Sequence, residues 1–491
     1  MDQSRKVMKH APNTCTVSSF HLDEIPSSLM MKIQSTLPKL PPNVSTFIFT
    51  SPQSLFRHHR FLQFLLQRNL IKFVVIDEIH LFAQFGNTFR DEFGQLKKSL
   101  FDKLRQNKVP SLFMIATCTE FLITDLQHMT GYIIRKRHWP SPSMMAHRSV
   151  KIDTRYTHQR FRVLKECIRS ALLPSPSRPL IRRKAIIYKM SHASARSISE
   201  KLAEYLDTTI DLHKIDIITL VGTMTKEEKG FYTNLFLSEK EVSRYNAQIM
   251  CATSGAGNAG LDSTAIGSIF RLGMPESMSD FFQEKGRAGR YPNAHPTENR
   301  YTICFSIEDL LYLFRRTMNP IELVINESYR KRKVIDLIQM ALVLASDECM
   351  NRHVERIIGN QEKKMFNLQT VVIATFVIMI GCFLKSTKTE QVLLDLFVFG
   401  NGNLNGKPNL TALVTAFQTY PDGRRLIITG TRSTRPFQPV EIKKILFMLV
   451  AHGMLILHFE PNMKEVIFRL AKASHNASVL AIQYHPYWVV M

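Results

Sequence analysis

Two adjacent carboxylates give the chain its first chemical signal. Asp77 and Glu78 follow Phe73–Ile76, an apolar segment with the pattern of a buried strand, in the string VVIDEIH over 74–80. Ligands of open parallel sheets bind at the carboxyl ends of strands, so both acids are expected there. Such a pair suits a magnesium–nucleotide site, where one carboxylate holds the metal and the other polarises an attacking water. The simpler interpretation is an ordinary strand end with solvated acids.

An aromatic segment follows directly at 81–93. Phenylalanines interleave there with polar residues: Phe82, Phe85, Phe89 and Phe93 with Gln84, Arg90 and Glu92. Aromatic side chains on a loop beside a nucleotide site can stack on single-stranded bases. The alternative is an aromatic stripe that faces the core.

A third signal is the string QEKGRAGR at 283–290. Gly286 and Gly289 keep the backbone open, and Arg287 and Arg290 lie three residues apart, which predicts that they share one helical face. Two such arginines can clamp a transferring phosphoryl group; the alternative is an exposed basic helix. Before them, CATSGAGNAGLD at 251–262 predicts a strand and a glycine-rich turn, whose amides can approach phosphates.

The elements that position these residues follow an α/β pattern. Over 1–137, apolar strands at Thr46–Thr50 and Phe73–Ile76 flank an amphipathic helix at Leu55–Arg68, which predicts a parallel α/β sheet. A linker rich in Pro, Ser and Met follows at 138–149. The pattern returns over 150–320, with a helix at 193–206 and strands at 184–188, 215–220, 248–253, 268–272 and 300–305. Two α/β units joined by a linker form a natural cleft.

The remaining chain has a different pattern. Residues 321–400 are predicted to be mostly helical and open with RKRK at 330–333. Residues 401–491 are predicted to hold helices and then a β-ribbon, at 410–419, 440–453, 455–459 and 465–470. Two helices and a ribbon are typical of a winged helix-turn-helix, and a plain α+β packing module is the alternative.

Composition bounds the class of protein. A length of 491 residues predicts two to four domains, and 45% hydrophobic with 21% charged residues excludes a wholly disordered chain. Seven cysteines without a CxxC pair exclude a disulfide scaffold. The net charge of +23 indicates a polyanionic partner, nucleic acid before membrane. No secretory signal is recognised, and the apolar run 371–384 is shorter than the ~20 residues of a membrane span, so an intracellular protein without a membrane partner is expected.

Together and in this order, the motifs resemble those of the RecQ-family DNA helicases of superfamily two, over roughly residues 45–350. DEIH at 77–80 resembles the family's DExH box, with Ile79 where alanine is usual, and FMIATCT at 113–119 resembles its strand-end motif. Three further sets resemble the aromatic-rich loop, the ATxxFGMGID segment and the QxxGRAGR motif: Gln84, Phe85, Gly86, Phe89 and Arg90; Ala252, Thr253, Gly260, Leu261 and Asp262; and Gln283, Gly286, Arg287, Gly289 and Arg290. The resemblance implies two RecA-like lobes, the first incomplete.

The resemblance also implies roles. Asp77 would coordinate magnesium, Glu78 would activate water, and Arg287 and Arg290 would act on the γ-phosphate. The implied nucleotide-binding residues are His80, Gly260, Asp262 and Gln283. The implied DNA-binding residues are Gln84, Phe85, Phe89, Arg90, Thr117, Thr119 and Thr253. With ATP and magnesium, the implied activity is 3′-to-5′ helicase or translocase action on single-stranded or forked duplex DNA, in recombination, repair or replication, in the nucleus.

Departures from the family pattern leave a second hypothesis open. No GxxxxGK[ST] phosphate loop occurs in the sequence, and none of the 76 residues before Asp77 matches it. Cys349 stands where a zinc cysteine is expected, but Cys382 and His353 complete no set of four ligands, so zinc is not expected. The helicase hypothesis therefore includes a chain inactive by itself. The alternative is a non-catalytic nucleic-acid-binding pseudo-helicase or a gene fragment, and a plain interaction scaffold is the third.

Overall fold

The computed structural model divides into two compact units, each considered by itself. The N-terminal unit comprises residues 1–139 with 323–329, and the C-terminal unit comprises 140–322 with 330–491. The structure describes residues 16–22, 25–41, 44–79, 97–115, 120–134, 150–172, 184–208, 215–238, 247–254, 261, 263, 265–290, 299–319, 327–345, 409–419, 438–451, 455–460 and 465–470. The predicted division into five segments remains a prediction.

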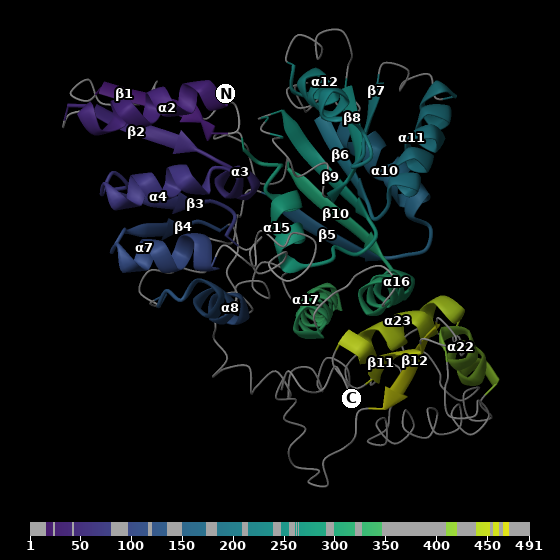
Figure 1. Ribbon diagram of the computed structural model, residues 1–491. Helices are drawn as coiled ribbons and strands as arrows, with labels where there is room; N and C mark the ends of the chain where they lie inside the picture. Colours follow the sequence, from purple (N-terminus) through teal and green to yellow (C-terminus); the bar gives the residue numbers. More distant parts are fainter. Residues whose placement is uncertain are drawn as a thin grey trace. The chain divides into compact units, whose positions relative to one another are not determined.

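The N-terminal unit contains two separate pairs of parallel strands (Figure 1). Strand β1 (Thr16–His21) pairs with β2 (Val44–Phe49), and β3 (Val74–Ile76) pairs with β4 (Ser111–Phe113). The helices are α2 (Ser27–Thr36), η2 (Leu37–Lys39), α3 (Pro52–Arg57), α4 (His59–Gln67), the π-helix η3 (Lys97–Phe101), α7 (Asp102–Gln106) and α8 (Glu120–Thr130). The predicted sheet is thus two two-stranded sheets in the part of the chain that is described.

The helix predicted at 55–68 is interrupted. His58 leaves helical geometry, with φ −105° and ψ 31°, and separates α3 from α4. The apolar face of α4 still packs as its periodicity predicts, because Phe61, Leu62, Leu65 and Leu66 are all buried. The hydrophobic pattern therefore predicted the buried face correctly, although it did not show the break.

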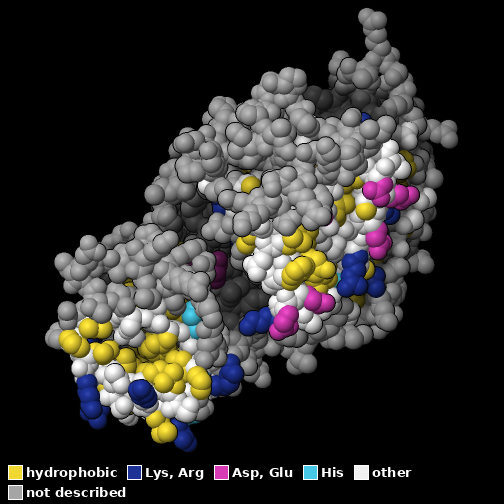
Figure 2. Space-filling model, turned by 90° about the horizontal axis from the view of Figure 1, so that it is seen from above, with side chains coloured by type: hydrophobic (Ala, Val, Ile, Leu, Met, Phe, Trp, Pro, Cys, Tyr) yellow, Lys and Arg dark blue, Asp and Glu magenta, His cyan; other side chains and the backbone are white. Residues whose placement is uncertain are grey.

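One face of the β3–β4 pair carries exposed apolar side chains. Val75 and Leu112 stand opposite each other in register and are 49% and 45% exposed. On the same unit, Figure 2, seen from above, shows hydrophobic side chains gathered with Lys and Arg side chains at the end where β1 and α2 lie. Parallel sheets are normally covered on both faces. In the described part of the chain, one face of the β3–β4 pair packs against the core and the other face is exposed.

The C-terminal unit is built on a six-stranded sheet in which every pairing is parallel, in the order β5-β10-β9-β6-β8-β7. The strands are β5 (Lys151–Tyr156), β6 (Lys184–Lys189), β7 (Ile215–Leu220), β8 (Ala247–Thr253), β9 (Ile266–Leu272) and β10 (Arg300–Phe305). The predicted α/β class is confirmed. The five strands predicted in this region are all present, and β5 was not predicted.

Helices cover both faces of this sheet, which explains why the central strands β6, β8 and β9 are almost wholly buried. Helices α10 (Arg160–Leu172) and α11 (His192–Asp207) pack on one face. The core of the other face includes α12 (Lys226–Leu237), α15 (Met278–Lys285), α16 (Ile307–Met318) and α17 (Glu327–Ala345). Capping boxes fix two helix starts, Ser191 with Ser194 and Thr225 with Glu228.

The C-terminal elements share the core of the sheet. They are α22 (Leu410–Thr419), α23 (Pro439–Ala451) and the antiparallel pair β11 (Leu455–Glu460) and β12 (Glu465–Leu470). Phe447 of α23 is 1% exposed, and its ring centroid lies 5.2 Å from that of Phe305 and 5.9 Å from that of Tyr156. Lys443 also pairs with Glu308 of α16 at 2.6 Å.

Three predictions for the C-terminal half have different outcomes. The predicted helices and ribbon strands are present, while the winged-helix interpretation and its plain α+β alternative both stay predictions. The apolar run 371–384 and the residues Cys349, His353 and Cys382 lie outside the described residues. No helix within the described ranges is long and apolar enough to cross a membrane.

The shared aromatic contact predicts a large effect of one truncation. Phe447→Ala removes a buried ring that packs on both Phe305 and Tyr156, so we expect a loss of about 3–5 kcal/mol in the free energy of unfolding, measured by urea denaturation. Phe231→Ala is the matched control, because Phe231 is 63% exposed, and we expect it to cost under about 0.5 kcal/mol. Equal effects of the two variants would show that α23 does not contribute to the core of the sheet.

Candidate functional site

The acidic pair lies in a turn directly after β3, as predicted. The Glu78 amide donates a hydrogen bond to Asp77 Oδ1 at 2.9 Å, and Glu78 has φ of 49°, in the left-handed region. Ile79 is fully buried, and its amide donates to the Met114 carbonyl at 3.1 Å, just beyond β4. The buried isoleucine and this bond anchor the turn, while the side chain of Asp77 stays exposed.

This turn suits a magnesium ion better than a protein-enclosed metal centre. Magnesium is usually bound through one or two carboxylates, waters and substrate phosphates, and the exposed Asp77 carboxylate at a strand end can serve as such a ligand. Groups of three or more potential metal ligands do not occur within the described residues.

Most residues predicted around this turn lie outside the described part of the chain. They are His80, Gln84, Phe85, Phe89, Arg90, Thr117 and Thr119, together with Gly260 and Asp262 of the second unit. Their predicted roles remain predictions.

The predicted geometry of the two arginines is wrong. Helix α15 ends at Lys285, and the Gly286 amide closes its last turn by donating to the Phe282 carbonyl at 2.8 Å. Gly289 has φ of 74°, in the region that favours glycine. Arg287 and Arg290 therefore lie in a glycine-shaped turn beyond the helix and do not share a helical face.

The arginine turn contacts the segment CATSGAGNAGLD, the second motif predicted for this unit. Arg287 Nη1 donates to the carbonyl of Leu261 at 2.8 Å, and Leu261 is flanked by Gly260 and Asp262. Arg290 is exposed, and its Nε donates to the Gly286 carbonyl at 2.8 Å. Gln283 is partly buried on α15. Thr253, the last residue of β8, is only 8% exposed.

A buried ion pair joins the strands to this turn. Arg271 of β9 and Glu284 of α15 are both 0% exposed, and Arg271 Nη1 lies 2.7 Å from Glu284 Oε1. The same Oε1 accepts from Ser254 Oγ at 2.8 Å, and Oε2 accepts from the Tyr301 hydroxyl at 2.6 Å. Arg271 Nη2 donates to the Met274 carbonyl at 2.9 Å.

The electrostatics of this cluster follow from burial. Burial raises the pKa of the Glu284 carboxyl, and the Arg271 guanidinium and the Tyr301 hydroxyl oppose that rise. Burial also raises the pKa of Tyr301, which therefore stays a hydrogen-bond donor. A buried carboxylate is tolerated when its oxygens are hydrogen-bonded and its charge is paired. The cluster thus fixes α15, and with it the arginine turn, against the ends of β8 and β10.

Sequence reasoning missed this cluster, although one signal for it was present. Arg271 is a charged residue within an otherwise apolar strand, SIFRLG at 268–273. A charge in a strand buried on both faces needs a partner. The sequence alone offered no means of identifying Glu284, Tyr301 and Ser254 as the groups that meet it.

A double-mutant cycle tests the ion pair. Arg271→Met leaves a buried carboxylate without its counter-charge, so we expect the free energy of unfolding to fall by about 3–5 kcal/mol, as measured by urea denaturation. Replacing both residues, as in Arg271→Met with Glu284→Leu, should cost clearly less than the sum of the two single changes.

The exposed pair of Arg162 and Glu166 is the control, with a nitrogen–oxygen distance of 3.8 Å and side chains 68% and 60% exposed. Its cycle, with the same substitutions, should give a coupling of about 0.5 kcal/mol or less. Additive costs at Arg271 and Glu284 would contradict the proposed coupling.

Several RecQ-like DNA helicases are similar to the chain in sequence. The chain is 24% identical to the ATP-dependent DNA helicase RecQ of Pasteurella multocida over 255 residues, which covers 51% of this chain and 35% of that protein. It is 25% identical over 230 residues to the RecQ-like DNA helicase blm-1 of Caenorhabditis elegans, with coverage of 46% and 20%. The RecQ helicase of Bacillus subtilis is 24% identical over 298 residues, with coverage of 61% and 44%. No family model matches the chain.

Among solved structures, the chain matches helicases at low similarity. The Mycobacterium smegmatis helicase Lhr, bound to single-stranded DNA and AMP-PNP, has a TM-score of 0.39 and 16% identity, covering 72% of this chain and 44% of Lhr. The helicase MrfA bound to DNA has a TM-score of 0.41 and 14% identity, covering 70% and 46%. The matches to the sequence relatives span well under two thirds of those proteins' lengths. Over about half of its length, the chain is similar in sequence to the RecQ-like DNA helicases, as its motifs predicted.

Proposed function

We propose that the chain is a RecQ-like, ATP-dependent DNA helicase or translocase. The observation that carries the proposal is the Arg271–Glu284 cluster with the Arg287–Leu261 bond, which together hold the arginine turn against the segment after β8. An acidic turn after β3 and a fixed arginine turn are two of the parts that proteins use in phosphoryl transfer. The similarity to proteins named RecQ helicases supports the same proposal.

Each residue has a proposed role. Asp77 holds magnesium, which supplies charge neutralisation on the phosphates when it is bound. Glu78 accepts a proton from the attacking water, and Arg287 and Arg290 stabilise negative charge on the transferring group. Gln283 and His80, with Gly260 and Asp262, contact the nucleotide. The DNA-binding roles proposed for Gln84, Phe85, Phe89, Arg90, Thr117, Thr119 and Thr253 rest on the family resemblance.

The finer points of the proposal also rest on that resemblance. They are 3′-to-5′ movement on single-stranded or forked DNA, a role in recombination, repair or replication, and a nuclear location. They include two RecA-like lobes at 1–137 and 150–320, a linker at 138–149, a helical region at 321–400 and a winged-helix-like module at 401–491.

A second candidate function is nucleic-acid binding without ATP hydrolysis. The observation that favours it is the sequence itself, which contains no GxxxxGK[ST] string. That loop normally supplies backbone amides and a lysine to the β- and γ-phosphates. The charge of +23 supports DNA binding under either function.

ATP turnover distinguishes the two functions. With the first, the purified chain hydrolyses ATP faster when single-stranded DNA is added, and Glu78→Gln lowers that rate by about 10²–10⁴-fold because proton transfer from water is lost. Glu227→Gln, at an exposed acid on α12, should leave the rate unchanged. Turnover that survives in Glu78→Gln would contradict the role of Glu78, and no turnover in the unaltered chain would support the second function.

DNA binding should depend on salt under both functions. If about four backbone phosphates are contacted, the affinity for single-stranded DNA should fall roughly fifty-fold between about 50 and 200 mM salt, since each contact contributes about −0.7 to the logarithmic slope. Fluorescence anisotropy with a labelled oligothymidylate measures this slope. An affinity that does not change with salt would exclude the phosphate backbone as the main contact and favour a plain interaction scaffold.

A further inference from the structure

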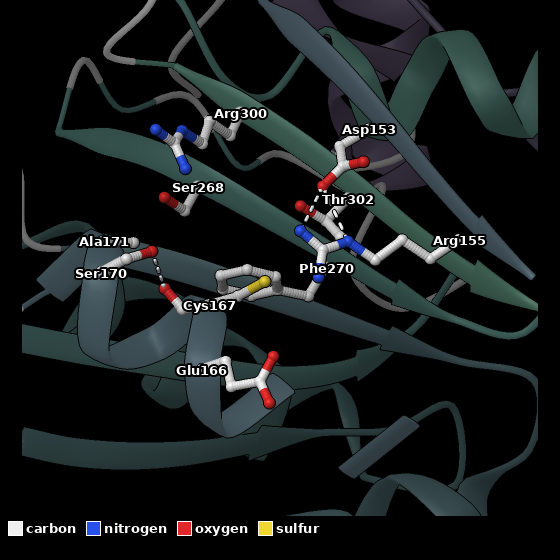
Figure 3. Close-up of a pocket in the computed structure, with 10 residues that line it drawn as sticks. All are labelled: Asp153, Arg155, Glu166, Cys167, Ser170, Ala171, Ser268, Phe270, Arg300 and Thr302. Carbon is white, nitrogen blue, oxygen red and sulfur yellow. Dashed lines mark hydrogen bonds and ion pairs between the residues drawn. The ribbon is translucent and has the colours of Figure 1, made fainter. Parts of the chain in front are cut away.

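A small polar pocket lies on the face of the six-stranded sheet that α10 covers, in the amino-terminal halves of β9 and β10 and the middle of β5 (Figure 3). Its volume is about 120 Å³, well below the roughly 300–1,000 Å³ of pockets that hold drug-sized ligands. None of the candidate site residues described above lines it. The pocket therefore suits one small chemical group, and it is separate from the proposed helicase site.

Three side chains on two adjacent strands form its floor. Arg300 begins β10 and stands in register with Ser268 of β9, while Thr302 follows Arg300 on the same face of β10. Neighbouring strands are about 4.8 Å apart, and residues two apart on a strand share a face. One guanidinium and two hydroxyls consequently lie on one face of neighbouring strands and line a space the size of a single group.

The hydroxyls of Ser268 and Thr302 are buried, and neither has a partner among the residues that the structure describes. Ser268 is 5% exposed and Thr302 is 3% exposed. Within the described residues, neither hydroxyl makes a hydrogen bond, and both line the pocket. Buried polar groups in proteins nearly always have a partner, from the protein, water or a ligand. These hydroxyls can donate to an acceptor that occupies the pocket.

The charged side chains that line the pocket are two acids, Asp153 and Glu166, and two arginines, Arg155 and Arg300. Asp153 is held by Arg155, whose Nε and Nη2 lie 2.9 Å and 2.8 Å from its Oδ2. Glu166, at the exposed rim, lies 3.8 Å from Arg162 Nε. Arg300 has no ion pair with any residue that the structure describes. The guanidinium of Arg300 is thus the cation of the lining that can pair with an anion in the cavity.

We propose that this pocket binds a phosphate group, with Arg300 as its counter-ion and the Ser268 and Thr302 hydroxyls as donors. A guanidinium presents paired N–H groups that match two oxygens of a phosphate. The group is either free inorganic phosphate or a phosphate of a nucleic acid, because the recognising chemistry is the same. A pocket that holds only water is the competing explanation.

The thiol of Cys167 lines the same pocket and reports on occupancy. Burial raises the pKa of this thiol, so alkylation by iodoacetamide is followed at about pH 9, where more thiolate forms. Potassium phosphate should slow alkylation of Cys167 several-fold relative to chloride at equal ionic strength, as measured by peptide mass spectrometry. The buried Cys251 and Cys304 serve as unreactive internal references. A parallel arm with an oligothymidylate identifies the source: protection by the oligonucleotide but not by phosphate assigns the pocket to nucleic acid.

Matched variants decide the outcome. Arg300→Gln should abolish the protection, whereas Arg169→Gln, at an exposed arginine of α10 outside the pocket, should retain it. Thermal unfolding of both variants verifies that they fold, and Ser268→Ala, with weakened protection expected, replaces Arg300→Gln if that variant does not. Equal protection in Arg300→Gln, equal protection by chloride, or no protection by either phosphate source would overturn the proposal. None of these results depends on ATP hydrolysis.

Discussion

The buried pairing of Arg271 with Glu284 is the constraint on which the arrangement of the C-terminal unit depends. An arginine inside a strand that is covered on both faces is tolerated only if a carboxylate is brought to it. Glu284 meets that need from α15, and the same carboxylate takes hydrogen bonds from Ser254 and Tyr301. The Glu284 carboxylate therefore links α15 to three strands: β9 through Arg271, the end of β8 through Ser254, and the start of β10 through Tyr301. The glycine-shaped turn that carries Arg287 begins directly after this fixed point.

The motif QEKGRAGR contains both a buried residue that positions the helix and an exposed residue in the turn that follows. Within QEKGRAGR, the Glu284 side chain is directed inward and determines position, whereas the Arg290 side chain is exposed. Gly286 ends the helix and Gly289 shapes the turn that follows, so that Glu284 and the two arginines need not share a helical face. In the N-terminal unit, Ile79 has the inward role in the DEIH string and Asp77 the outward one.

The sequence predicted those parts of the fold whose physical signal is local. Continuous apolar runs predicted β6, β8 and β9, because strands buried on both faces need no alternation. The edge strand β5, KIDTRY, was missed because Asp153 and Arg155 place charges on the face that lines the pocket. The position of Asp77 after a strand was predictable from its neighbours. The Arg271–Glu284 pair was not, since residues 13 apart in the chain meet only once the sheet and α15 have packed.

The open face of β3 and β4 has a consequence for how the protein behaves in solution. Each strand pairs with only one other in the described part of the chain, and Val75 and Leu112 are exposed. Unpaired strand edges and exposed apolar side chains are the usual templates for intermolecular strand pairing. The N-terminal unit alone should therefore self-associate at concentrations where the C-terminal unit, with its covered sheet, stays monomeric. Self-association, more than any loss of activity, would then limit the concentration at which the isolated N-terminal unit can be studied.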